Sequence, residues 1–196
     1  MSTQQESRMH RARFYEVIRL PLFHGTLTQS QVDGMEYLLD YAETHLPPLD
    51  LRQVAYIFAT VYHETARTMQ PIEEYGKGAG YPYGVPDPET GECYYGRGFV
   101  QITWKQNYLY QQEKLGHPLV ERPDCALEPG CAAAILYEGM LDGDFTGVSV
   151  GDYVNTTQCD YTNARRVVNG VDCAEQIAGY AQVFQEALVQ AVCPCV

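Results

Sequence analysis

Residues 94–104 have the sequence Tyr-Tyr-Gly-Arg-Gly-Phe-Val-Gln-Ile-Thr-Trp, and their alternating pattern predicts an amphipathic β-strand. One face of this strand is expected to pack inward through Val100, Ile102 and Trp104. Gln101 and Thr103 lie on the opposite face, where they either contact a sugar or a water molecule, or are simply exposed to solvent. The glycines that flank Arg97 indicate close backbone approach or an unusual dihedral angle.

Helical patterns lie on both sides of this stretch. Thr28 and Gln31 have the spacing of a capping box, before a helix that Pro47 ends. Asp50 is placed to cap a second helix, which Pro71 ends. The apolar stripe of that second helix is Leu51, Val54, Ala55, Phe58, Val61 and Tyr62. Three more helices are expected over residues 104–115, 131–141 and 174–192. The predicted fold class is mainly α (α+β), with a small β-hairpin.

The segment from Tyr75 to Gly91 contains a high density of glycine and proline. It includes Gly76, Gly78, Gly80, Pro82, Gly84, Pro86 and Pro88. This composition predicts an exposed loop, and a loop of this length inside a compact domain is usually functional. The loop-rich face is therefore the expected position of a cleft.

The length and the charge of the chain limit the possible functions. With 196 residues, 45% of them apolar, the chain is expected to form one domain over residues 1–196. Residues 1–20 are expected to form an N-terminal extension or helix, and residues 192–196 a cysteine-containing tail. The net charge of −12 argues against binding to nucleic acid or to an anionic membrane. No segment approaches the roughly 18 apolar residues of a membrane-spanning helix.

The cysteines are numerous and odd in number. There are seven: Cys93, Cys125, Cys131, Cys159, Cys173, Cys193 and Cys195. Their spacing includes no Cys-x-x-Cys pair of the kind that binds zinc. We therefore expect structural thiols or late-forming disulfides, with no metal and no cofactor.

Three glutamates are candidates for acid–base chemistry. Glu64 follows Ile57 and Val61 at the edge of the apolar stripe, where apolar neighbours disfavour the charged form of a carboxyl group. Glu73 and Glu74 follow the second helix, and hydrolysis of a glycoside needs two carboxyl groups that face each other across a cleft. The alternatives are a helix-edge glutamate that faces water and two solvated loop charges.

Several motifs in this order resemble glycoside hydrolase family 19, the plant-type chitinases and their phage and bacterial lysozyme-like relatives. The motifs are His63-Glu64-Thr65-Ala66, the 94–104 stretch followed by Asn107-Tyr108, and Val168-Asn169-Gly170. The similarity extends over residues 27–188. It implies a lysozyme-like helical domain with a loop-rich catalytic cleft.

The resemblance also implies roles for single residues. Glu64 corresponds to the general acid and Glu74 to the base that activates water, with Glu73 as the alternative base or a substrate-binding neighbour. Thr103 holds the water molecule. The other substrate-binding positions are Gln101, Asn107, Asn169 and Tyr95. Arg97 is expected to brace the acidic cluster rather than to touch substrate. Gln176 stands where the plant enzymes have a supporting arginine in the final helix.

Peptidoglycan is the substrate that the resemblance favours, cleaved at β-1,4 bonds by an inverting, endolysin-like or lysozyme-like monomer. Chitin is the alternative substrate. A glycan-binding or virion structural protein without turnover is the alternative of another class. Residues 1–13 are polar and no apolar signal segment follows them. We therefore expect synthesis in the cytoplasm and access to the cell wall through a separately made membrane pore.

Overall fold

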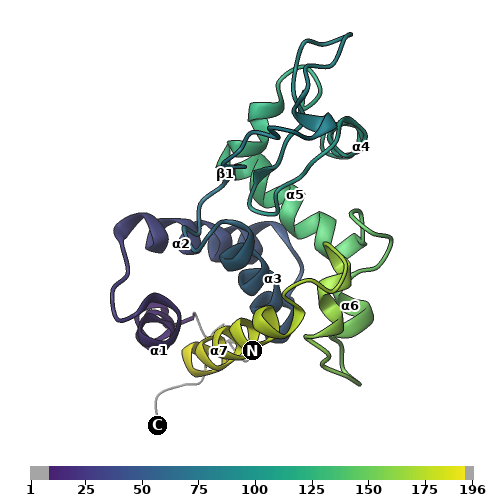
Figure 1. The fold of residues 1–196 in the computed structure, drawn as a ribbon. Coiled ribbons are helices and arrows are strands. Elements are labelled where there is room, and N and C mark those ends of the chain that lie inside the picture. Colours follow the sequence, from purple (N-terminus) through teal and green to yellow (C-terminus); the bar gives the residue numbers. More distant parts are fainter. Residues whose placement is uncertain (1–8, 193–196) are drawn as a thin grey trace, which may run out of the picture.

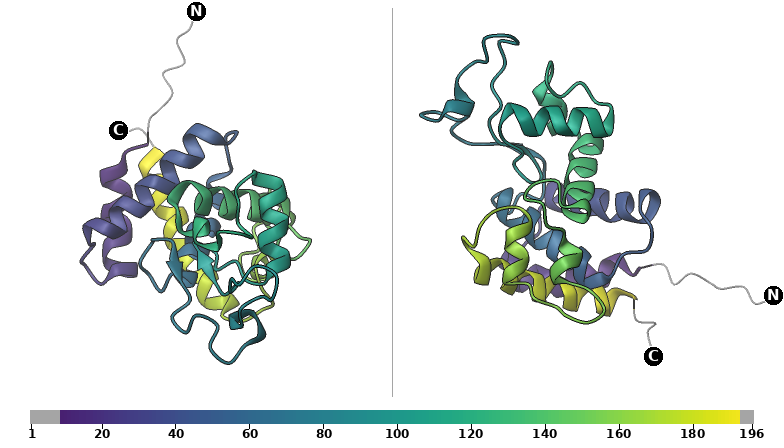
Figure 2. Two further views of the ribbon diagram at one scale, coloured as in Figure 1. Left: turned by 90° about the horizontal axis from the view of Figure 1, so that it is seen from above. Right: turned by 90° about the vertical axis from the view of Figure 1, so that its right-hand side faces the viewer.

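A computed structural model describes residues 9–192 of the chain. Seven α-helices occupy half of this range and the only sheet described has two short strands, which confirms the mainly α prediction. The helices are α1 (Arg11–Phe23), α2 (Gln29–His45), α3 (Leu51–Glu64), α4 (Lys105–Leu115), α5 (Pro129–Asp142), α6 (Val150–Tyr153) and α7 (Ala174–Val192). Short 3-10 helices add η1 (Pro82–Gly84), η2 (Pro123–Leu127) and η3 (Asn163–Val167). Figures 1 and 2 show α1, α2, α3 and α7 in one part of the molecule and α4 in another, with α5 running between them.

Helix α3 forms the centre of the hydrophobic core. Asp50 caps its first turn by accepting the N–H of Arg52 at 2.9 Å, as the sequence predicted. Every residue of the range 54–62 is buried, because α3 packs against α7 and also contacts α5 and α6. The predicted apolar stripe is therefore only part of the buried surface of α3, which is covered on nearly all sides.

The end of α3 differs from the prediction. The helix ends at Glu64, seven positions before Pro71, because Ala66 and Arg67 adopt left-handed backbone conformations with φ of 48° and 70°. The sharp turn that follows leads directly into β1. Glu64 is consequently the last helical residue, with its side chain at the end of the buried helix rather than within it.

Helix α2 packs against this turn at Gly34. The Thr28–Gln31 capping box is present, and a Cβ atom added to Gly34 would lie 1.8 Å from the carbonyl oxygen of Met69. The helix backbone therefore approaches the turn as closely as only glycine allows. This contact holds in place the turn that follows Glu64.

Replacing Gly34 with alanine is expected to destabilise the protein by about 3 kcal/mol, because the new methyl group must push α2 away from Met69. Urea unfolding measures this loss. Gly179 in α7 is the matched control, since its added Cβ atom has nothing within 4 Å and lies on an exposed helix face. Gly179→Ala should leave stability unchanged or raise it, and equal losses in both variants would contradict the role given to Gly34.

The predicted strand over residues 94–104 is wrong in extent. Only β2 (Arg97–Gly98) is a strand, and it pairs antiparallel with β1 (Ile72–Glu73) in the register Ile72↔Gly98 and Glu73↔Arg97. The two strands are joined by the long segment 74–96, so they form no tight hairpin. This segment projects away from α1, α2, α3 and α7 (Figures 1 and 2).

Residues 98–104 turn back on themselves instead of continuing the strand. Gly98, Gln101 and Trp104 have φ of 86°, 56° and 75°, and the backbones of Arg97 and Ile102 form an isolated bridge. The inward face expected from alternation is therefore not formed. Phe99, Val100 and Ile102 are all buried, whereas Trp104 is 48% exposed.

The remaining expectations concern the termini and the cysteines. The expected N-terminal helix is α1, which begins at Arg11 and continues past residue 20 to Phe23. Residues 1–8 and most of the expected 192–196 tail, including Cys193 and Cys195, lie outside the described residues. Within the described range, the five cysteines are unpaired. None of the helices described is long and apolar enough to cross a membrane.

Candidate active site

A cleft of about 330 Å³ opens at the end of α3. Five of the residues expected in the site lie around it: Glu64, Gln101, Thr103, Asn107 and Asn169. They come from the end of α3, the 98–104 turn, the first turns of α4 and the segment after η3. Tyr83, Val100, Ile102, Trp104, Phe145 and Val168 complete the lining. The cleft thus brings together polar groups from three distant parts of the sequence.

Glu64 is paired with a buried arginine and is not held only against apolar neighbours, as the sequence suggested. Arg165 donates to Glu64 Oε1 at 2.7 Å, and the side chains are 3% and 17% exposed. Nε of Arg165 also donates to the carbonyl oxygen of Asp172 at 3.1 Å, which fixes the guanidinium in place. The two contacts together hold the Glu64 carboxyl group at the edge of the cleft.

Sequence reasoning missed Arg165. The family resemblance predicted a supporting arginine in the final helix, where this chain has Gln176, and the Gln176 side chain is exposed. The arginine instead comes from η3, four residues before Asn169. Its nearness to the Val168-Asn169-Gly170 motif was the one available signal, but only the fold shows that it meets Glu64, 101 positions away.

The 98–104 turn presents Thr103 to the cleft with a free acceptor. Its hydroxyl donates to the carbonyl oxygen of Gln101 at 2.9 Å, so the lone pairs of Oγ1 remain able to accept a hydrogen bond from water. Gln101 is itself fixed, because its Nε2 donates to the carbonyl oxygens of Ile72 and Gly98 at 2.9 and 3.1 Å. Asn107 donates to the Thr103 carbonyl oxygen at 2.7 Å and so ties α4 to the turn.

Glu74 lies beside the cleft and is linked to it by Tyr83. The Tyr83 hydroxyl donates to Glu74 Oε1 at 3.4 Å, and the backbone N–H of Gly96 donates to Oε2 at 3.1 Å. A Cβ atom added to Gly96 would lie 2.9 Å from Gln101 Oε1 and 3.4 Å from Glu74 Cβ. The side chains of Glu74 and Gln101 therefore both contact Gly96.

Glu73 is engaged in a separate set of contacts. It accepts the Tyr95 hydroxyl at 2.6 Å and forms an ion pair with Lys77 at 2.9 Å. The Tyr95 hydrogen bond, followed by that of Lys77, holds the pKa of Glu73 below its usual value. Desolvation and the same hydrogen bond raise the pKa of Tyr95. Both oxygens of Glu73 are thus occupied by partners outside the cleft lining.

Arg97 lies beside this cluster and contacts Tyr95. Its guanidinium lies 3.7 Å from the centre of the Tyr95 ring and pairs with Asp124 at 2.9 Å. After the Tyr95 and Lys77 hydrogen bonds, the positive charge of Arg97 also helps to lower the pKa of Glu73, which agrees with the expectation that Arg97 braces the acidic cluster. Arg97 fixes the position of the tyrosine that in turn holds Glu73.

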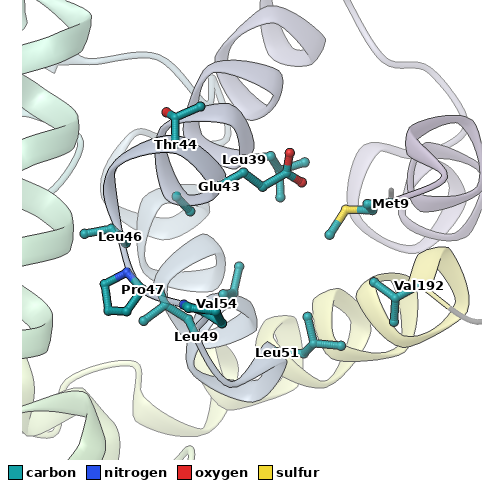
Figure 3. A pocket seen from close by; sticks show the side chains of 12 residues that line it. Met9, Leu39, Glu43, Thr44, Leu46, Pro47, Leu49, Leu51, Val54 and Val192 are labelled. Atoms are coloured by element: carbon teal, nitrogen blue, oxygen red, sulfur yellow. The ribbon is translucent and has the colours of Figure 1, made fainter. Parts of the chain in front are cut away.

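A larger groove lies elsewhere and lacks a comparable group of polar side chains. It has a volume of about 750 Å³ and lies between the end of α2, the start of α3 and the two ends of the described chain. Figure 3 shows mainly apolar side chains around it, with Glu43 as the charged member. Among the described residues, this groove therefore offers a poorer set of groups for acid–base chemistry than the cleft at Glu64.

Solved structures of chitinases share this architecture. Chitinase C from Streptomyces griseus HUT6037 is 20% identical in sequence, with a TM-score of 0.65 and 99% of each chain covered. A bacterial family 19 chitinase is 20% identical, with a TM-score of 0.52, over 91% of this chain and 93% of that chain. A family 19, class IV chitinase from Zea mays is 16% identical, with a TM-score of 0.51, over 91% and 90% of the two chains.

No protein-family model matches the sequence, and comparison with curated proteins finds no match. The likeness in three dimensions nevertheless extends over nearly the whole chain. The chain therefore has the lysozyme-like, mainly α-helical fold of the family 19 chitinases.

Proposed function

We propose that the protein is a glycoside hydrolase that cleaves β-1,4 bonds between N-acetylated amino sugars with inversion at the anomeric carbon. The observation that supports this most directly is the cleft itself. Its lining includes Glu64 and Thr103, whose hydroxyl is fixed by Gln101, and the carboxylate of Glu74 accepts the Gly96 N–H and the hydroxyl of the lining residue Tyr83. A pair of carboxyl groups with room for a water molecule is what inverting hydrolysis requires.

Glu64 is the proposed general acid. It gives its proton to the glycosidic oxygen as the bond to the anomeric carbon breaks, and the departing sugar leaves with a free hydroxyl group. The carboxylate that remains is stabilised by the Arg165 guanidinium at 2.7 Å. In the protonated form, the Arg165 hydrogen bond to Oε1 fixes the rotamer of Glu64, so that the proton on its other oxygen is positioned for transfer.

Glu74 is the proposed general base. It removes a proton from a water molecule whose other hydrogen is accepted by Thr103 Oγ1, and the water oxygen forms the new bond to the anomeric carbon. Glu74 suits this role better than Glu73, because its partner Tyr83 lines the cleft, whereas Glu73 is held by Tyr95 and Lys77 outside the lining. These two contacts also lower the pKa of Glu73, which makes it a weaker base.

A matched pair of variants separates the two glutamates. Glu74→Gln is expected to lower the hydrolytic rate by at least 100-fold, on the order of the contribution of a general base. Glu73→Gln should stay within a few-fold of the wild type, because the amide oxygen still accepts the Tyr95 hydroxyl. Reducing-end release from a soluble glycan measures both rates. The opposite pattern would assign the base to Glu73.

Peptidoglycan is the substrate that we propose, with action at the bacterial cell wall. Its support is the resemblance of the Pro71-Ile72-Glu73-Glu74 segment to the short phage-like members of the family. Chitin is the second candidate, because the structural neighbours are named chitinases. Both polymers contain β-1,4-linked N-acetylglucosamine, so the same pair of carboxyl groups serves either.

Digestion of the two purified polymers distinguishes these substrates. Mass spectra of the peptidoglycan products should show cleavage after one of its two amino sugars, with slower release from colloidal chitin. The anomer formed first, followed by proton NMR, should be inverted relative to the bond cleaved. Tight binding to peptidoglycan without any new reducing ends would instead indicate a non-catalytic glycan-binding protein and would refute hydrolysis.

A further inference from the structure

Three aromatic side chains form a continuous surface that extends from the cleft. We call Tyr81, Tyr83 and Trp104 the aromatic platform. The rings of Tyr81 and Tyr83 are stacked with centroids 5.1 Å apart, and Trp104 meets Tyr83 edge-on at 5.1 Å. Tyr83 and Trp104 also line the cleft, whereas Tyr81 does not. The aromatic platform therefore begins in the cleft and continues beyond it.

Two of these side chains are exposed to solvent despite their size. Tyr81 is 57% exposed and Trp104 is 48% exposed. Large aromatic side chains gain stability chiefly by burial, so exposed rings in mutual contact indicate a surface that is covered by something else. Their apolar faces match the C–H faces of pyranose rings.

Trp104 is held in this position by a strained backbone. Its φ of 75° and ψ of 134° lie in a region that residues with side chains rarely adopt. Three backbone hydrogen bonds maintain it. The N–H of Trp104 donates to the Tyr94 carbonyl oxygen at 2.8 Å, and its own carbonyl oxygen accepts the N–H groups of Asn107 and Tyr108 at 3.0 and 3.2 Å. Backbone strain of this kind concentrates at binding and catalytic sites.

The loop that bears Tyr81 and Tyr83 is fixed by two further contacts. The backbones of Gly78 and Gly84 pass so close that a Cβ atom on Gly84 would lie 2.1 Å from the Gly78 carbonyl oxygen. Lys105, in the first turn of α4, forms ion pairs with Asp87 and Glu89, each at 2.8 Å. The loop is thus fastened next to Trp104, so the aromatic platform is formed before ligand arrives.

We propose that the aromatic platform is an additional sugar subsite, which stacks on a pyranose ring of the polymer beyond the units held in the cleft. This deepens the proposed function and depends on it for the chemistry of the ligand. An extended β-1,4-linked chain that fills the cleft reaches Tyr81 only if it is long enough. The aromatic platform therefore selects for polymer length, and short oligomers do not use it.

The single tryptophan of the chain reports directly on this subsite, because Trp104 is the only source of indole fluorescence. The probes are β-1,4-linked N-acetylglucosamine oligomers of two and six units, added to the Glu64→Gln variant so that no hydrolysis occurs. The six-unit oligomer should change the emission of Trp104 in a saturable manner. Calorimetry on the same samples provides an independent dissociation constant.

Tyr81→Ala tests whether the aromatic platform extends past the cleft. It is expected to weaken binding of the six-unit oligomer about tenfold and to leave binding of the two-unit oligomer unchanged. Tyr75→Ala is the matched control, since Tyr75 is 80% exposed on the same loop but lies outside the aromatic platform. It should bind both oligomers as the parent variant does.

Trp104→Gly separates binding from stability. Glycine accepts the positive φ at this position without strain, so the variant should unfold at the same temperature or higher while losing affinity for the six-unit oligomer. A Trp104 with only a structural role would instead lose stability when truncated.

Two outcomes would overturn this proposal. One is saturating calorimetric binding of the six-unit oligomer without a change in Trp104 emission, and the other is unaltered affinity in Tyr81→Ala. Neither depends on turnover. If the wild type releases no reducing ends while the fluorescence changes as expected, the subsite stands and the hydrolytic function fails.

Discussion

Glu64→Gln is expected to abolish nearly all hydrolysis of the glycan, with a loss of roughly 1,000-fold in rate. An amide is nearly the same shape as a carboxyl group, but it has no acidic proton to give to the glycosidic oxygen. The amide oxygen of the variant side chain still accepts the Arg165 guanidinium, so the fold and the cleft are retained. Reducing-end release from peptidoglycan, or lysis of outer-membrane-permeabilised Gram-negative cells, measures the loss.

The control for this variant is substrate binding. Calorimetry should show that Glu64→Gln still binds a six-unit N-acetylglucosamine oligomer in a saturable manner. Its circular dichroism spectrum should be the same as that of the wild type. If Glu64→Gln lyses cells at the wild-type rate, Glu64 is not the general acid. A loss of both binding and structure would mean that the variant tests folding alone.

Arg165→Met is expected to lower both activity and stability. Arg165 is 3% exposed, and its removal leaves the Glu64 carboxylate at 17% exposure without its counter-charge. Breaking one side of a buried ion pair in this way costs about 2–4 kcal/mol. The hydrolytic rate should also fall, because the carboxylate left after proton transfer loses its stabilisation and Glu64 loses its fixed rotamer. Urea unfolding and reducing-end release provide the two measurements.

The double variant Glu64→Gln, Arg165→Met tests why Arg165→Met is less stable than the wild type. If the destabilisation arises from the unpaired charge of Glu64, neutralising that charge should recover most of the lost stability. The double variant should therefore be clearly more stable than Arg165→Met alone. Equal stabilities would show that the loss comes from packing around Arg165 and that the ion pair contributes little.

The helices were predictable because their determinants are local. The capping box of Thr28 and the Asp50 cap mark helix starts, and apolar periodicity locates α4, α5 and α7 to within two residues of their observed bounds. The family resemblance predicted the lysozyme-like fold, and five of the residues that it singled out line one cleft with Glu64 among them. The helix caps and the periodicity depend on residues close together in the sequence, and the resemblance depends on the order of the motifs along the chain.

The features that sequence reasoning missed depend on tertiary contacts. The end of α3 and the 98–104 turn are set by left-handed residues with side chains, Arg67, Gln101 and Trp104, whose types do not favour that conformation. Alternation therefore predicted a strand where the chain turns. Arg165 was missed for a similar reason, since its partner lies 101 positions away.

The pairing of β1 with β2 fixes the two ends of the segment that bears Tyr81 and Tyr83 beside the cleft. The backbone N–H of Glu74 donates to the Gly96 carbonyl oxygen at 2.7 Å, so the segment leaves and re-enters the domain at neighbouring points. Residues 75–92 could therefore be replaced by a segment of another length without moving β1 or β2. Grafting a shorter or longer segment between these two ends is expected to change which glycans are preferred, while Glu64 and Glu74 keep their positions.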